Sequence, residues 1–140
     1  MKIRKANSQD VQRLKQIDHL SYQPERASFI ERAVSSGTAW VVIVKSEVVA
    51  YAVLDHSYFE RPTIAMLIVN SQQRRSGIGN SLVEHLEQIC DGLEIWTSTN
   101  LSNIPMQRLL AKRGYHLTGF IDNLDPGDPE LFYFKKLEKT

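Results

Sequence analysis

Residues 64–79, IAMLIVNSQQRRSGIG, decide the fold expected for this chain. The apolar run at 64–69 is short and bounded by polar residues, which predicts a buried strand. The apolar spacing of residues 81–90, SLVEHLEQIC, predicts a helix. Between them, Gly77 and Gly79 allow a sharp turn and a close approach of backbone N–H groups to a ligand. Since a helix start also presents the positive end of its dipole, this segment predicts a cradle for an anion such as a phosphate.

Two common phosphate loops do not fit this segment. A P-loop ends in Gly-Lys-Ser/Thr, whereas Asn80 follows the second glycine here. The dinucleotide fingerprint needs a third glycine and a later acidic residue, and residues 78–82, IGNSL, supply no third glycine. Glycines also close ordinary strand-to-helix turns. Residues 74–79 by themselves therefore leave two alternatives open: a purely structural turn, or a phosphate site for another ligand.

The spacing Arg74-x-x-Gly77-x-Gly79, after a strand that contains Leu67 and Val69, resembles the acetyl-CoA loop of the GCN5-related N-acetyltransferase (GNAT) superfamily. A second segment, residues 103–115, NIPMQRLLAKRGY, resembles the next motif of that family. There an Asn opens a helix that ends in Gly followed by an aromatic residue. Gly114 suits the left-handed position at a helix end, and Lys112 and Arg113 suit its negative dipole end.

The resemblance implies one α/β domain over residues 1–140, a single GNAT-like domain with a mixed, bent sheet and the order β-α-α-β-β-β-α-β-α-β-β. The strands are expected to follow the chain in the sheet except at the last hairpin, with helices on both faces. Periodicity and turn residues predict strands at 2–5, 39–44, 48–54, 64–69, 93–98, 115–121 and 131–137. They predict helices at 8–20, 25–36, 81–90 and 103–113.

By the same resemblance, acetyl-CoA is the expected co-substrate. The amide of Leu67 would donate to the acetyl carbonyl and that of Val69 to the pantetheine arm, while both side chains are expected in the core. The N–H groups of residues 75–80 would hold the pyrophosphate, and Asn103 would contact pantetheine. The expected cofactor-binding set is Leu67, Val69, Arg74, Arg75, Ser76, Gly77, Ile78, Gly79, Asn80 and Asn103.

One position departs from the family pattern. Many members carry a tyrosine four residues before the helix-ending glycine, where it protonates the departing thiolate, and the matching residue here is Leu110. General acid catalysis contributes roughly 10²–10⁴-fold, but a thiol with a pKa of about 8.5 leaves tolerably without it. The function that the resemblance implies is an N-acetyltransferase that acts on a primary amine of a small molecule or peptide. The alternative is a non-catalytic acyl-CoA sensor.

Candidate catalytic groups are the Leu67 amide, Tyr133 and Glu60. Either Tyr133 or Tyr58 is the candidate acid, and the base is open among Tyr51, His56, Tyr58, Glu60 and Tyr133. Glu60 is expected in a loop over residues 55–60, which also holds the further candidates His56 and Tyr58. Tyr51, a further candidate, is expected on the preceding strand. Four acids cluster around the last turn, where they would attract a cationic amine or simply face solvent: Asp122, Asp125, Asp128 and Glu130.

Composition limits the remaining classes. The chain has 140 residues, 42% of them hydrophobic, and a net charge of +1, so no broad basic face for nucleic acid is expected. The single Cys90 excludes an internal disulfide and is expected as a buried thiol on the helix face of Leu82, Leu86 and Ile89. No histidine spacing predicts a metal site. No signal segment or membrane span is expected, which favours a cytoplasmic protein, monomeric or homodimeric.

Overall fold

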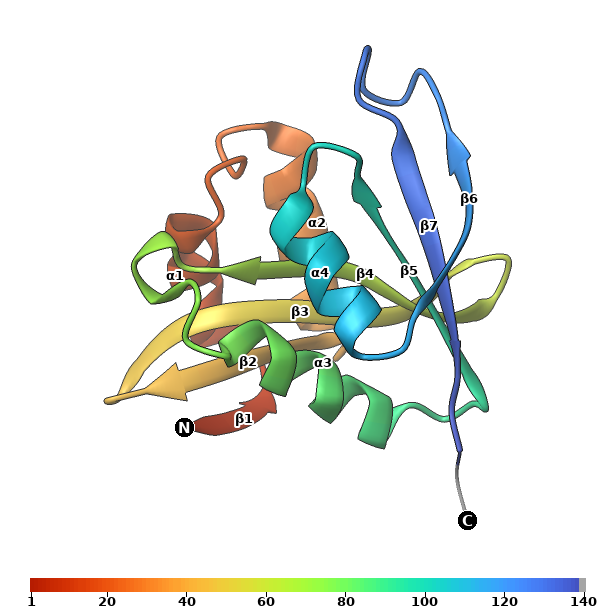
Figure 1. Cartoon of the computed structure of the whole chain (residues 1–140). Helices are drawn as coiled ribbons and strands as arrows, with labels where there is room; N and C mark the ends of the chain where they lie inside the picture. The colour runs from red at the N-terminus through yellow and green to blue at the C-terminus, as the bar shows by residue number, and fades with distance from the viewer. Residues whose placement is uncertain (139–140) are drawn as a thin grey trace. The chain divides into compact units, whose positions relative to one another are not determined.

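The computed structural model describes residues 1–138, so the last two residues of the expected domain, Lys139 and Thr140, lie outside the described part. The order of helices and strands is the predicted one, with two added 3-10 turns (Figure 1). The strands are β1 Lys2–Lys5, β2 Ala39–Val44, β3 Glu47–Tyr58, β4 Arg61–Val69, β5 Glu94–Asn100, β6 His116–Ile121 and β7 Glu130–Lys136. The helices are η1 Ser8–Asp10, α1 Val11–Ile17, α2 Pro24–Ser35, η2 Ser71–Gln73, α3 Ile78–Ile89 and α4 Ile104–Lys112.

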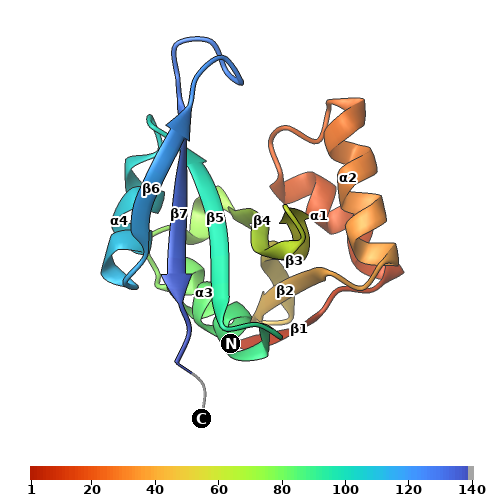
Figure 2. The same ribbon diagram turned by 90° about the vertical axis from the view of Figure 1, so that its right-hand side faces the viewer.

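The strands form a mixed sheet in the order β1-β2-β3-β4-β5-β7-β6. β4 and β5 are parallel, whereas the ladders β1–β2–β3 and β5–β7–β6 are antiparallel. The predicted exception at the last hairpin is confirmed, because β7 lies between β5 and β6 (Figure 2). The chain divides into two compact units, which are described separately: Met1–Leu54 with Met66–Leu86, and Asp55–Ala65 with the chain from Glu87 onward.

In the first unit, helices cover both faces of the β2–β3 hairpin. The hairpin closes through Lys45 and Ser46, whose positive φ values of 50° and 66° are those of the turn that matches strand twist. Tyr51 lies opposite Val41, and its hydroxyl reaches Asp18 just after α1. On the alternate face, the Trp40 ring packs 4.9 Å from the His85 ring of α3. The prediction of helices on both faces is therefore confirmed for these strands.

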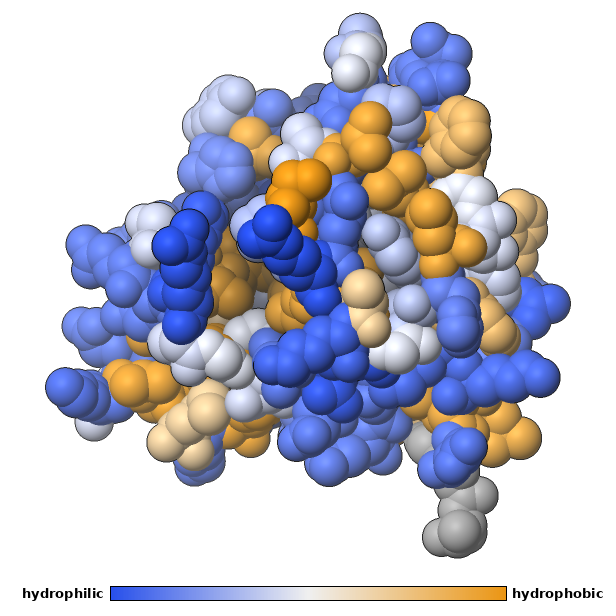
Figure 3. Space-filling view, viewed as in Figure 1, coloured by the Kyte–Doolittle hydropathy of each residue, from blue (hydrophilic) through white to orange (hydrophobic). Residues whose placement is uncertain are grey.

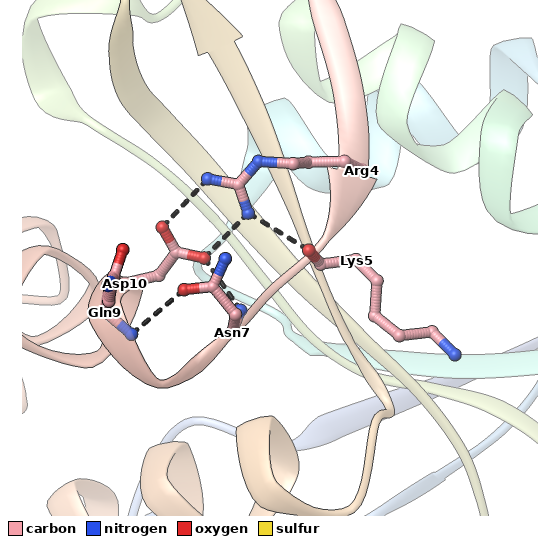
Figure 4. A network of polar contacts seen from close by, with 5 residues as sticks. All are labelled: Arg4, Lys5, Asn7, Gln9 and Asp10. Atoms are coloured by element: carbon pink, nitrogen blue, oxygen red, sulfur yellow. Dashed lines mark hydrogen bonds and ion pairs between the residues drawn. The ribbon is translucent and has the colours of Figure 1, made fainter.

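The first helix is shorter than the predicted span 8–20 and begins differently. Asn7 caps the start: its side chain accepts from the Gln9 N–H, while Asp10 accepts from the Asn7 N–H at 2.8 Å (Figure 4). Arg4 of β1 holds the same carboxylate through two contacts of 2.8 and 3.0 Å. The Arg4 guanidinium keeps the pKa of Asp10 below its usual value, and a backbone bond from Asn7 adds to this against the effect of burial.

The predicted loop over residues 55–60 is wrong for most of its length. Strand β3 continues to Tyr58 and turns through Phe59 and Glu60, whose φ values are 52° and 63°, directly into β4 at Arg61. The chain reverses within two residues, so the polar residues of this segment form strand rather than loop. Polar composition suggested a loop, but pairing within the sheet sets the strand length.

The second unit is organised around Glu87 at the end of α3, which is only 8% exposed. Its carboxylate accepts from Arg113 at 2.7 Å, Tyr115 at 2.9 Å and Lys135 at 3.1 Å. Gly114, with φ 87°, makes the predicted left-handed turn between the first two donors. Burial alone would raise the pKa of Glu87, but the three donors outweigh it and hold the pKa below its usual value.

Strand β6 is an edge strand and carries exposed apolar side chains. Leu117, Phe120 and Ile121 are 59%, 65% and 47% exposed, and Leu124 in the following turn is 61% exposed. Hydrophobic residues gather on the surface over the region of α4 and β6 (Figure 3).

Cys90 is buried, as predicted. Ile89, expected on the same buried face of the helix, is 37% exposed because α3 ends there.

Replacing Glu87 by Gln is expected to lower stability in a pH-dependent way. Because the folded-state pKa of Glu87 is depressed, its contribution is full above about pH 5 and is lost as the pH falls through the folded value. The variant should unfold about 2–3 kcal/mol more easily at pH 7. Its deficit should shrink below about pH 4. Urea unfolding across pH measures this, with the exposed Glu47→Gln as control; a pH-independent deficit would contradict the assignment.

Candidate functional site

The last part of β4 carries the two backbone positions expected to contact a thioester and its arm. Leu67 and Val69 lie near the end of the strand, as predicted, but their side chains are half-exposed rather than core. The parallel ladder with β5 contains Thr63 and Ile64, and these are buried. Residues 65–69, beyond that ladder, are half-exposed, which corrects the interpretation of 64–69 as a wholly buried strand.

The turn after β4 has the backbone shape of an anion cradle. Arg75 and Gly77 both have positive φ, 66° and 83°, so the chain bends twice before α3. A Cβ added at Gly77 would meet no atom within 4 Å, so the space in front of this backbone is open. Ser76 Oγ donates to the Gln73 carbonyl oxygen and ties the turn together. Arg74 and Arg75 are exposed and add positive charge.

Helix α3 begins three residues earlier than the predicted 81–90. The Ser81 N–H donates to the Gly77 carbonyl at 3.0 Å, so Ile78, Gly79 and Asn80 belong to the first helical turn. Gly79 is therefore a helical residue and not, as expected, part of the sharp turn. N–H groups of a first turn have no partner within their own helix and, with the helix dipole, attract anions.

Asn103 occupies the start of α4, as its motif predicts. Its Oδ1 accepts from the Met106 N–H at 3.2 Å, so this oxygen caps the helix. The residue is exposed. A contact with a bound ligand would then come from its side-chain NH₂ group. Leu110, at the position of the family tyrosine, is fully buried on the same helix.

The two side chains expected in catalysis lie in different surroundings. Tyr133 of β7 is 6% exposed and, as predicted, lies on the face opposite Phe132 and Phe134. Burial raises the pKa of Tyr133 above the ordinary tyrosine value. Glu60 is exposed at the second position of the β3–β4 turn, in contact with solvent.

Two other candidates have structural partners. Tyr51 is fully buried and its hydroxyl donates to Asp18 at 2.5 Å, where Arg26 also binds the carboxylate through two 2.9 Å contacts. Burial, with the Asp18 hydrogen bond and charge, raises the pKa of Tyr51 far above its usual range, so Tyr51 does not serve as a base. His56 lies 3.4 Å from Asp91 in an exposed pair.

The acidic turn is tied to the end of β5 rather than left to solvent. Asp125 accepts from the Asn100 side chain at 2.9 Å, and Asp128 accepts from the Ser102 N–H and hydroxyl at 2.9 and 2.6 Å. Asp122 is exposed. These bonds hold the β6–β7 turn against the β5–α4 connection, so Asp125 and Asp128 have a structural role.

Glu130 joins a polar cluster that sequence reasoning did not assemble. Ser98 Oγ donates to Glu130 Oε2 at 2.7 Å and lies 2.5 Å from the Tyr58 hydroxyl oxygen. Tyr58 and Glu130 were each candidates, but Ser98 was missed. The alternation of β5 places Ser98 on the face of Trp96, which is the only signal the sequence offers. Three strands distant in sequence supply the cluster, so pattern analysis of one segment does not find it.

Within residues 1–138, no group of three or more His, Cys, Asp or Glu side chains is arranged to hold a metal ion. Over the same described residues, none of the helices combines the length and the apolar composition that a membrane crossing requires.

Comparison with known families identifies the class. The model of the acetyltransferase (GNAT) family matches residues 7–115, and the chain belongs to that family. Among solved structures, an acetyltransferase of the GNAT family from Bacillus cereus ATCC 10987 is 26% identical with a TM-score of 0.89, covering 99% of this chain and 98% of that one. A search of curated proteins gives no significant match.

More distant structures share the fold. An aminoglycoside 6'-N-acetyltransferase complexed with coenzyme A is 18% identical, with a TM-score of 0.82 and coverage of 100% of this chain and 99% of that one. Ard1 from Thermoplasma volcanium is also 18% identical, with a TM-score of 0.83 and coverage of 99% and 98%. The predicted family and fold class are confirmed.

Because Leu110 is fully buried, a tyrosine there is expected to disturb packing rather than simply supply an acid. Leu110→Tyr should destabilise the protein by about 1–3 kcal/mol, since the larger ring and its hydroxyl enter a filled site. The neighbouring Leu109→Tyr, at a half-exposed position, is the matched control and should change stability less. Chemical denaturation measures both; equal effects would show that the site at Leu110 has room.

Proposed function

We propose that this protein transfers an acetyl group from acetyl-CoA to a primary amine of a small molecule or peptide. The observation that carries the proposal is the cradle: positive φ at Arg75 and Gly77, open space at Gly77, two exposed arginines and the start of α3. This combination suits a pyrophosphate. Because the chain belongs to the acetyltransferase family, coenzyme A is the proposed phosphate ligand. The whole chain, residues 1–140, would act as one domain.

In this proposal the backbone supplies most of the chemistry. The Leu67 amide donates to the acetyl oxygen as negative charge develops there, and the Val69 amide holds the pantetheine arm. Residues 75–80 bind the pyrophosphate, Arg74 and Arg75 add charge, and the Asn103 side-chain NH₂ contacts pantetheine. Donors fixed in place before the reaction stabilise an oxyanion strongly, because they need no reorganisation.

Tyr133 is the proposed acid and Glu60 the proposed base. The Tyr133 phenol carries a proton near neutral pH, since the ordinary pKa of tyrosine is about 10 and burial raises that of Tyr133 further, and this proton would pass to the departing thiolate. Glu60 has the weaker support, because it is exposed at a hairpin turn and would act in contact with water. Catalysis by this chain does not need a metal in the proposal.

A second candidate function is an acyl-CoA sensor without catalysis. The buried Leu110 supports it, because the usual acid is replaced by a side chain that cannot transfer a proton. Both functions use the cradle to bind the ligand, and they differ only in whether the acetyl group is transferred.

We further propose a cytoplasmic protein without nucleic-acid or membrane partners. It would be a monomer, or a homodimer that uses the exposed apolar edge at β6.

Two measurements separate these functions. Thermal shift with acetyl-CoA, ATP or NAD tests the cradle: a ligand at 100 times its dissociation constant adds about 2.7 kcal/mol of stability. Stabilisation by ATP or NAD but not by acetyl-CoA would overturn the coenzyme A assignment. Release of free thiol with a library of primary amines then tests transfer. Binding of acetyl-CoA with no release for any amine favours the sensor.

Gly77→Val is expected to raise the dissociation constant for coenzyme A roughly tenfold or more, because the valine side chain fills the space in front of the cradle. Gly127→Val is a matched control. Gly127 also has a positive φ, 78°, and open space at its Cβ, but it lies in the β6–β7 turn. Both variants should lose similar stability from backbone strain, about 1–2 kcal/mol. Titration calorimetry with coenzyme A decides; equal affinity in both variants would place the phosphates elsewhere.

Tyr133→Phe is expected to reduce turnover roughly 10²-fold or more while leaving acetyl-CoA affinity unchanged, if its hydroxyl protonates the thiolate. Tyr115→Phe is the control, because that buried hydroxyl donates to Glu87 and serves the fold. Tyr115→Phe should lower stability but not turnover per folded molecule. Unaltered turnover in Tyr133→Phe would remove Tyr133 from the mechanism.

A further inference from the structure

The polar cluster of Tyr58, Ser98 and Glu130 has a defined direction of hydrogen bonding. Ser98 has one hydroxyl proton, and it is donated to Glu130 Oε2 at 2.7 Å. The 2.5 Å contact between Ser98 Oγ and the Tyr58 hydroxyl must then use the Tyr58 proton. The order of donation is Tyr58 to Ser98 to Glu130, so both hydroxyl protons point inward along the cluster.

The consequence is a site that offers acceptors and no free hydroxyl donor. The Tyr58 oxygen retains lone pairs, and a carboxylate accepts through both oxygens, so Glu130 Oε1 remains an acceptor. Among the described residues, no Lys or Arg is ion-paired with Glu130. Such a set of groups suits an ammonium, which is a pure donor with three N–H bonds, and repels phosphates and carboxylates.

Aromatic rings and negative charge surround the same groups. The Tyr58 ring packs 5.3 Å from Phe132, and Trp96 packs 4.8 Å from Phe134. The registers of β5 and β7 pair Ser98 with Phe132 and Trp96 with Phe134, so these side chains share one sheet face with Glu130. Ring faces attract ammonium ions, more strongly where water is partly excluded. The cluster is half-buried, which leaves it accessible while reducing its contact with water.

The pKa of Tyr58 reports the local field. Burial raises it, the hydrogen bond with Ser98 lowers it, and the negative charges of Glu130 and Asp55 raise it further. Two carboxylates therefore act on the Tyr58 oxygen. Burial disfavours any charge, but the negative charges of Glu130 and Asp55 also attract a cation to this place.

The cluster also lies beside the point where the β4–β5 ladder ends. Thr97 pairs with Ile64, and Ser98 is the next residue of β5. Thr97 points to the other face and donates to the Ile64 carbonyl at 2.9 Å, so it belongs to the sheet rather than to the cluster. Ser98 is thus held firmly by a paired strand, which fixes the direction of the Glu130 carboxylate.

We propose that Glu130, oriented by Ser98 and Tyr58 and flanked by Phe132, binds an alkylammonium group of the acceptor. The inference rests on the proposed acetyltransferase function and names its substrate class: cationic primary alkylamines, in preference to neutral or anionic molecules. The ammonium is either the group to be acetylated or a second cationic group of the same acceptor.

Binding of 1-pentylammonium to the full chain, measured by NMR titration without acetyl-CoA, tests the proposal, with 1-pentanol as the neutral probe. Wild type should bind the ammonium at least tenfold more tightly than the alcohol, and Glu130→Gln should remove this preference. Asp122→Asn is the matched control, because it removes one exposed acid from the adjacent turn. It should change affinity less than twofold. Equal affinity of Glu130→Gln and wild type for pentylammonium overturns the proposal.

Ser98→Ala keeps the Glu130 charge and tests the cluster if Glu130→Gln does not fold. It should weaken binding by a few-fold, because the carboxylate loses its fixed direction. Unchanged binding in Ser98→Ala would overturn the role of the cluster. Higher salt should weaken the binding of the ammonium and not that of pentanol.

Acetylation assays then identify which ammonium is bound and separate this inference from the function it rests on. If 1-pentylamine is acetylated with a KM that rises in Glu130→Gln, the site holds the reacting amine. If only 1,5-diaminopentane is acetylated, it holds the second cation. Absence of any acetylation with intact ammonium binding counts against the enzyme and leaves the site standing. Acetylation with the same KM in wild type and Glu130→Gln counts against the site alone.

Discussion

The hydrogen bonds of the buried Glu87 carboxylate hold the second unit together. The carboxylate receives donors from the end of α4, from the residue before β6 and from β7, at 2.7, 2.9 and 3.1 Å. An unpaired buried carboxylate is costly, so these elements must meet at one place for the charge to be tolerated. That requirement ties β7 to the end of α3 through Lys135. It also fixes Gly114 in its left-handed turn, because Arg113 and Tyr115 on either side both reach Glu87.

The first unit has a comparable centre in Asp18. The residue is 1% exposed, and its carboxylate binds Arg26 and the Tyr51 hydroxyl. Its Oδ1 also accepts from the Leu20 N–H at 3.0 Å, which shapes the chain between α1 and α2. Each unit therefore contains a buried acid that gathers donors from distant parts of the chain. Neither acid is available for catalysis, because its oxygens are already occupied by the fold.

The candidate chemistry uses the opposite arrangement, in which groups are held but left accessible. The cradle offers N–H donors and two exposed arginines, whereas the Tyr58–Ser98–Glu130 cluster offers acceptors. The cradle suits a phosphate, which the proposed ligand coenzyme A carries, and the cluster suits an ammonium, which the proposed acceptor carries. Preorganised polar groups of this kind act strongly because they do not have to reorient when the ligand arrives.

Local sequence patterns are enough to predict the order of helices and strands, the family and the turn at Gly77. These depend on the apolar run at 64–69, on Gly77 after it, and on Gly114 after a helix. Local chemistry also determined that Asn103 starts α4 and that Tyr133 faces away from Phe132. Such features are set within a few residues of chain, so periodicity and turn chemistry suffice to predict them.

Which polar residues are structural and which remain accessible depends on contacts between distant parts of the chain. Tyr51 and Tyr58 are both tyrosines of β3, but one donates to a buried Asp18 and the other to Ser98 of β5. Asp125 and Glu130 belong to one acidic segment, yet Asp125 accepts a hydrogen bond from Asn100 whereas Glu130 accepts one from Ser98. Likewise β3 extends to Tyr58 through strand pairing, against its polar composition. Partners distant in sequence set burial and hydrogen bonding, and no local pattern encodes them.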